Sequence, residues 1–171
     1  MADLKSGFNP LFLREKELRQ GMELLFYAYR DFAEEADAIL AEYELGRAHH
    51  RTLYFVGRHP AITVSELLSI LRITKQSLSR VLGELVAQDF ITQRPGLRDR
   101  RRRHLELTPK GVEIERMLSE KQRACIARAY RSAGAEAVEG FRKVLLGIVN
   151  DRDRHQIERP LAPPAVTAGK P

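Results

Sequence analysis

Arginine dominates one short stretch of this 171-residue chain. Residues 94–104 contain six arginines and a single acid, Asp99. Like charges packed so densely on a thin loop are unfavourable unless a polyanion lies beside them. A guanidinium on such a tip can enter the minor groove of a duplex, where A·T-rich sequence concentrates negative potential. The stretch is therefore a candidate nucleic-acid contact, and a solubilising loop or a proteolytic site is the alternative. The candidate residues are Arg98, Asp99, Arg100, Arg101 and Arg102.

A second candidate contact is the polar face of a helix predicted to begin at Thr74. Gln76 and Arg80 lie nearly opposite the apolar stripe of this helix. Gln pairs well with adenine and Arg with guanine in a major groove. An ordinary solvent-facing surface is the alternative. The residues predicted to face a groove are Thr74, Lys75, Gln76, Ser77, Ser79 and Arg80.

The charge distribution favours a polyanionic partner for this part of the chain. Residues 1–45 carry 5 Lys or Arg and 10 Asp or Glu, residues 46–110 carry 13 and 5, and residues 111–171 carry 11 and 8. The net charge of +6 is thus concentrated in the middle third of the sequence. A basic surface of this kind attracts nucleic acid.

Two short helices and a hairpin position these candidates. Thr63 and Glu66 have the spacing of a capping box, and Thr74 can cap a second helix that runs to about residue 88. Two such helices joined by a tight turn form a helix-turn-helix. The alternating residues that follow predict two strands around the turn at residues 95–96, with the arginines at the tip.

Longer helices flank this unit. Apolar residues recur at three- and four-residue steps after Asn9-Pro10, which predicts a helix of about thirty residues. A small domain cannot cover so long a helix, so we expect it to pack against a partner chain. Further helices are predicted at residues 47–58, after Thr108-Pro109 and at about residues 135–149. The proline-containing segment 154–171 lacks periodicity, and we expect it to be disordered.

The motifs resemble those of the MarR family of bacterial regulators. The wing signature is carried by residues 99–101 and 105–111, and the helix-turn-helix pattern by residues 63–67 and 74–80. Arg101 corresponds to the family's wing arginine. The resemblance implies a roughly triangular obligate homodimer, whose interface is formed by the first and last helices. Asp99 corresponds to the partner of the wing arginine, and Arg72 stands where the family usually has glycine, so we expect a turn that is less left-handed or mildly strained.

The expected fold is therefore mainly α with a small β-hairpin wing. An N-terminal dimerisation helix spans 9–45, a winged helix-turn-helix domain spans 46–108, and C-terminal dimerisation helices span 109–150. Family members often bind small aromatic acids between the dimer helices and the DNA-binding lobe, which implies a small aromatic or anionic effector. Tyr29, Arg30, Arg51 and Tyr54 could line such a cleft. Their alternative roles are core aromatics and surface ion pairs.

Other kinds of site find little support. His49 and His50 are adjacent, so on a helix their side chains diverge by about 100° and cannot easily share a metal. The single cysteine, Cys125, cannot form an internal disulfide, suits a reducing cytoplasm and is expected to be buried and inert. We find no nucleophile elbow, phosphate loop or zinc pattern, so we expect neither an enzyme nor a cofactor. No signal peptide is visible and no apolar run reaches the ~20 residues that cross a bilayer, so we expect a cytoplasmic protein.

The hypothesis that follows is a homodimeric regulator of transcription that reads a pseudo-palindromic site in double-stranded DNA. An architectural protein that coats DNA with little sequence preference is one alternative. A winged-helix module that binds an acidic protein is another. Gln76, Ser79 and Arg80 favour base reading over coating, and the long terminal helices favour a dimer over a monomeric adaptor.

Overall fold

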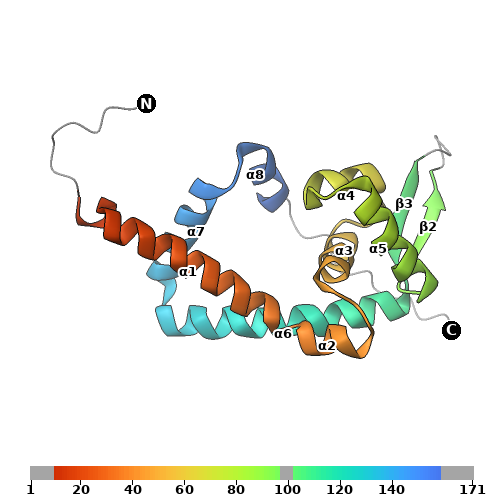
Figure 1. Cartoon of the computed structure of the whole chain (residues 1–171), viewed down its shortest axis with the longest axis horizontal. Helices are drawn as coiled ribbons and strands as arrows, with labels where there is room; N and C mark the ends of the chain where they lie inside the picture. Colours follow the sequence, from red (N-terminus) through yellow and green to blue (C-terminus); the bar gives the residue numbers. More distant parts are fainter. Residues whose placement is uncertain (1–9, 97–101, 159–171) are drawn as a thin grey trace.

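The computed structural model describes residues 10–96 and 102–158 of the chain. Its elements in chain order are η1 (Leu11–Leu13), α1 (Glu15–Glu34), α2 (Asp37–Glu42), α3 (Arg47–Arg58), β1 (Ile62–Thr63), α4 (Val64–Leu71), α5 (Lys75–Ala87), β2 (Ile91–Pro95), β3 (Arg103–Leu107), α6 (Pro109–Ala133), α7 (Ala135–Ile148) and α8 (Asp151–Glu158). Figure 1 shows α3 to β3 gathered at one end of the molecule and α1 and α7 at the other, with α6 running beneath both. This arrangement confirms the predicted mainly α fold with a hairpin wing.

The helix-turn-helix starts are set by their capping residues. Thr63 Oγ1 accepts a hydrogen bond from the backbone N–H of Glu66 at 3.3 Å, and the Glu66 carboxylate accepts one from the N–H of Thr63 at 2.8 Å. Together they form the predicted capping box of α4. The backbone hydrogen bond from Thr63 is the main cause of a lowered pKa at Glu66. Helix α5 follows a turn at Arg72, where φ is 51° and ψ is 40°. The turn is therefore fully left-handed, so the expectation of a less left-handed backbone is wrong.

The wing is a three-stranded antiparallel sheet in the order β1-β3-β2. Gln93 lies opposite Leu105 and Pro95 opposite Arg103, as the predicted hairpin requires. The third strand, β1, pairs with β3 and lies outside the sequence prediction, because a strand of two residues gives no alternating pattern.

The core lies between the hairpin, α3, α5 and the first half of α6. Its fully buried side chains are Leu40, Leu53, Val56, Leu67, Leu78, Val81, Leu85, Phe90, Ile91, Leu105, Ile114 and Leu118. The apolar spacing of α5 predicts that Val86 shares the buried stripe with Leu82, four residues earlier, but Val86 is exposed. It follows the fully buried Leu85 by one residue, about 100° further round the helix, which turns its side chain toward solvent.

Helix α6 begins in direct contact with the chain before β2. The Thr108 hydroxyl donates to the carbonyl of Asp89 at 2.6 Å, and the Thr108 N–H donates to the carbonyl of Phe90 at 3.1 Å. Gly111 sits so close that a Cβ there would lie 2.0 Å from the Phe90 oxygen. Only glycine permits this approach, which fixes the base of the wing against α6.

The single N-terminal helix predicted for residues 9–45 is divided. Residues 11–13 form the short helix η1, α1 starts only at Glu15, and a turn at residues 35–36 separates α1 from α2. Ala36 and Leu40 are buried in the core, whereas α1 has no buried residue, so the turn lets α2 pack while α1 projects away. Asp37 holds α2 in place by accepting two hydrogen bonds from Arg47, at 2.7 and 3.1 Å.

The start of the predicted disordered tail is helical, because residues 154–158 belong to α8. Asn150 Oδ1 accepts a hydrogen bond from the N–H of Arg152 at 3.2 Å, and Arg154 forms an ion pair with Asp151 at 3.2 Å. These local contacts stabilise a helix whose sequence has little apolar periodicity. Residues 159–171 of the predicted tail lie outside the described residues. No helix in the described ranges has both the length and the apolar character needed to span a membrane.

Candidate nucleic-acid interface

Helix α5 presents all six residues predicted to face a groove. Thr74, Lys75, Gln76, Ser77, Ser79 and Arg80 are all exposed. The opposite side of the helix is buried, with Leu78 and Val81 each 1% exposed and Leu85 fully covered. The apolar stripe therefore decides which face of α5 points outward, as the spacing predicts.

The first turn of α5 is ordered by its cap. Thr74 Oγ1 accepts a hydrogen bond from the N–H of Ser77 at 3.1 Å and donates one to Ser77 Oγ at 2.8 Å. The turn thus offers Lys75, Gln76 and Ser77 at the positive end of the helix dipole, a favourable place for an anion.

Arg80, at the middle of the exposed face, lies in a chain of contacts that reaches α3. Its Nη1 lies 3.9 Å from Glu84 Oε1, and the other oxygen of Glu84 lies 2.5 Å from His49 Nε2. His49 Nδ1 accepts a hydrogen bond from the N–H of Gly46 at 3.0 Å, so the ring proton resides on Nε2 and is donated to Glu84. This contact ties α5 to the start of α3. The sequence held no signal for it, because His49 and Glu84 lie on separate helices.

The base of the wing carries further arginines. Gly96 N–H donates to the carbonyl of Arg102 at 2.8 Å and closes the described part of the hairpin. Arg94 forms an ion pair with Glu106 at 3.3 Å, while Arg102 and Arg103 are exposed. The predicted wing residues Arg98, Asp99, Arg100 and Arg101 lie outside the described residues.

The four residues predicted for an effector cleft come together only in part. Arg51 Nη1 donates to the Tyr29 hydroxyl at 3.5 Å, which joins α3 to α1. Tyr54 follows on the same face of α3 and packs edge-on against Phe55 at a centroid distance of 5.1 Å. Arg30 is engaged elsewhere, because it forms an ion pair with Asp31 at 2.7 Å and its guanidinium lies 4.9 Å from the centre of the Tyr27 ring.

Two further titratable residues that the sequence offers as candidates are His50 and Cys125. His50 is buried and its Nε2 has no hydrogen-bond partner among the described residues. Burial, aided by the charge of Arg51, lowers the pKa of His50. Cys125 is half-buried, not fully buried as expected, since α6 extends past the core at that point. Within the described ranges no three His, Cys, Asp or Glu residues are grouped as a metal site requires.

Comparison with known proteins identifies the family. The model of the MarR family matches residues 43–102, which contain the helix-turn-helix and β2 and end before β3. The chain is 47% identical over 152 residues to the HTH-type transcriptional regulator PetP of Rhodobacter capsulatus, covering 89% of this chain and 92% of that protein.

Solved structures agree with this match in their fold. The crystal structure of MarR is 22% identical and superposes with a TM-score of 0.61, covering 90% of this chain and all of that one. The structure of Streptococcus pneumoniae FabT in complex with DNA is 21% identical, with a TM-score of 0.67 over 77% of this chain and 93% of the other. The relatives are regulators, so the prediction that the chain is not an enzyme is confirmed. Its sequence and fold together show that the chain belongs to the MarR family of transcriptional regulators.

Proposed function

We propose that this regulator binds double-stranded DNA as a cytoplasmic homodimer and reads a pseudo-palindromic site. In this proposal α5 enters the major groove and the arginine-rich wing enters the adjacent minor groove. The observation that carries the proposal is the outward face of α5, where groups able to read bases are exposed beside the basic hairpin. The solved structure of FabT in complex with DNA has the same fold, which supports binding of DNA.

Base reading is assigned to Gln76 and Arg80. Both side chains project away from the buried stripe of α5, and each can form two hydrogen bonds with one base edge. The contact of Arg80 with Glu84 is long, at 3.9 Å, and Arg80 is 73% exposed. So loose an ion pair leaves the guanidinium available to a guanine.

The helix-reading proposal is tested by a ratio of affinities. We expect Gln76→Ala and Arg80→Ala each to lose roughly 1–3 kcal/mol on the preferred site and much less on random DNA, where phosphate contacts dominate. Arg116→Ala on α6 is the control, because it removes one exposed arginine whose partners are Glu113 and Glu120. Titrations at fixed salt give specific over non-specific affinity for each protein. Parallel losses on both duplexes, or no loss, would refute base reading by α5 and favour an architectural role.

Dimerisation is supported by apolar surface that one chain leaves uncovered. Neither α1 nor α7 has a buried residue. On α1, Met22 is 73% and Phe26 64% exposed, and on α7 Val144 is 63% and Ile148 62% exposed. Surfaces of this kind mark protein–protein contacts, and a two-fold partner would cover both.

A charge placed within this surface tests the dimer. We expect the wild type to sediment at micromolar concentration as one species of twice the 19.5 kDa chain mass. Met22→Glu should shift this species toward the monomer, because a carboxylate would be buried without a partner. Gln20→Glu adds the same charge two residues earlier, on nearly the opposite side of α1, and should not. A stably folded wild-type monomer would refute the proposal.

An effector of the aromatic-acid class is proposed for the surface between α1 and α3. Arg51 supplies a cation, and Tyr29 and Tyr54 supply aromatic surface beside it. Benzoate is a suitable probe, and we expect it to weaken DNA binding by the wild type but not by Arg51→Gln. Equal weakening of both proteins, or of neither, would contradict this assignment.

A further inference from the structure

Arg72 combines a strained backbone with a long-range ion pair. Its φ of 51° lies in the left-handed region, where a side chain is costly and glycine is favoured. The Arg72 guanidinium reaches Asp153 on α8, eighty-one residues later, and its Nη2 lies 2.8 Å from Asp153 Oδ2. An arginine at a turn that suits glycine points to a role for its side chain.

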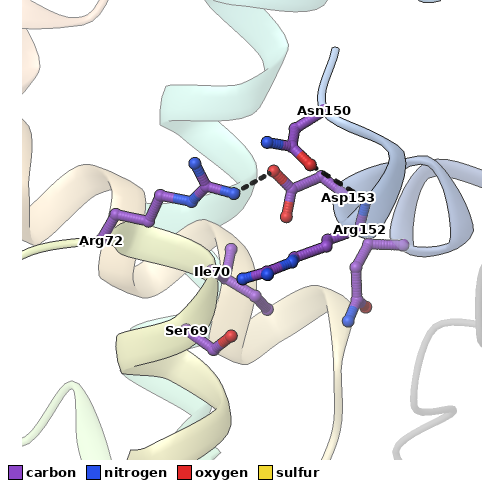
Figure 2. Close-up of a pocket in the computed structure, with 7 residues that line it drawn as sticks. Ser69, Ile70, Arg72, Asn150, Arg152 and Asp153 are labelled. Atoms are coloured by element: carbon purple, nitrogen blue, oxygen red, sulfur yellow. Dashed lines mark hydrogen bonds and ion pairs between the residues drawn. The ribbon is translucent and has the colours of Figure 1, made fainter.

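The ion pair closes one side of a polar cleft between α4 and α8, shown in Figure 2. Ser69 and Ile70 of α4 line the opposite wall, and Arg152 of α8 projects into the cleft. The side chains of Arg72 and Asp153 are 56% and 40% exposed. A pair so open to water contributes little stability and can exchange partners readily.

The position of Arg72 places it beside the proposed DNA face. It lies two residues before Thr74, the cap of α5, and the N-terminal end of a recognition helix is the part that approaches the duplex. A guanidinium matches two oxygens of a phosphate as well as it matches a carboxylate. The Asp153 carboxylate is therefore bound to the same guanidinium that a DNA phosphate at this point would bind.

We propose that Arg72 is a further contact to the DNA backbone and that Asp153 competes with phosphate for it. Helix α8 thus acts as an internal counter-ion, which keeps the Arg72 guanidinium from the phosphate for as long as the ion pair stays closed. This inference rests on the proposed function. Its consequence is that α8 lowers affinity for DNA of any sequence, because a phosphate contact carries no base information.

The competition is tested by removing the carboxylate. Asp153→Asn should raise affinity for a fluorescently labelled duplex of mixed sequence about two- to fivefold at low salt. The slope of log affinity against log salt, between about 50 and 200 mM, should steepen by up to about 0.9, because the guanidinium that Asp153 no longer holds neutralises one more phosphate. Asp151→Asn is the matched control, because it makes the same charge change in the same turn of α8 but Asp151 pairs with Arg154.

Arg72→Gly completes the cycle. Glycine accepts the left-handed turn without strain, so this variant should keep the wild-type thermal transition. In its background, Asp153→Asn and Asp151→Asn should have the same effect on affinity and slope. A difference that persists without Arg72 would show that Asp153 acts through another group.

The outcomes separate this inference from the proposed function. If Asp153→Asn and Asp151→Asn have the same affinity for DNA and the same salt slope, the competition is refuted but the proposed function is not. Weaker DNA binding by Asp153→Asn at an unchanged slope would also refute the competition. It would show instead that the ion pair positions the helix-turn-helix. Failure of every protein, wild type included, to bind the duplex would overturn both.

Discussion

Replacing Gly111 with alanine should move the first turn of α6 away from the base of the wing. The new Cβ would lie 2.0 Å from the Phe90 carbonyl oxygen and 3.0 Å from its carbon, where non-bonded atoms favour separations of about 3.5 Å. Both partners are backbone, so no rotamer change relieves the overlap. The backbone at the start of α6 must therefore shift by about 1 Å or more. This shift strains the hydrogen bond from the Thr108 N–H to the Phe90 carbonyl and the one from the Gly111 N–H to Thr108 Oγ1.

The magnitude follows from these interactions. Overpacking of this kind costs about 1–3 kcal/mol, and each hydrogen bond that breaks adds about 1 kcal/mol. The higher helix propensity of alanine returns about 1 kcal/mol. We therefore expect Gly111→Ala to lower the free energy of unfolding by about 2–4 kcal/mol.

Gly83→Ala is the matched control, because it makes the same substitution inside α5, where a Cβ would meet nothing within 4 Å. Its expected effect is a stabilisation of about 0.5–1 kcal/mol from helix propensity. Urea unfolding followed by circular dichroism, at one protein concentration, gives both values. A Gly111→Ala protein as stable as the wild type would refute the close approach of α6 to Phe90.

Three further predictions concern stability and DNA binding. The lowered pKa of His50 means that the folded state binds a proton at His50 less readily than the unfolded chain does. The contribution of His50 to stability should therefore be full above pH 6.5 and fall as the pH drops below it. Between about pH 8 and 5 the urea midpoint should fall less for His50→Asn than for the wild type, and equal falls would contradict the assignment. Thr63→Ala removes the cap of α4 and should cost about 1 kcal/mol in the same assay, whereas a neutral effect would contradict the capping box. Arg101→Ala should weaken binding to all sequences, most where the flanking minor groove is A·T-rich. The slope of log affinity against log salt should become shallower by about one unit for each phosphate that the wing no longer neutralises. An unchanged slope would show that the wing stays clear of DNA.

The sequence predicts the helix-turn-helix well because its signals are local. Thr63 and Thr74 cap the helices that they precede, and the apolar spacing along α5 identifies its outward face. Helix α3 likewise has the predicted bounds, since a glycine begins it and His59-Pro60 ends it.

Features that depend on distant contacts could not be predicted in this way. The N-terminal apolar periodicity continues through residue 36. The helix is divided there because Ala36 and Leu40 are buried in the core. The pairing of Arg72 with Asp153 joins segments whose proximity depends on how α6 and α7 fold back. Neither local propensity nor apolar spacing reports on such contacts.

Sequencing the fragments that the purified full-length protein retains from a random DNA library tests the proposal that its dimer reads bases. Two α5 helices related by a two-fold axis require two inverted half-sites, with centres about 10 base pairs apart, one turn of the duplex. We predict that the retained fragments share such an inverted repeat, and that Arg80→Ala lowers its enrichment. Retained fragments without a common sequence, bound as tightly as random DNA, would contradict sequence reading by this regulator.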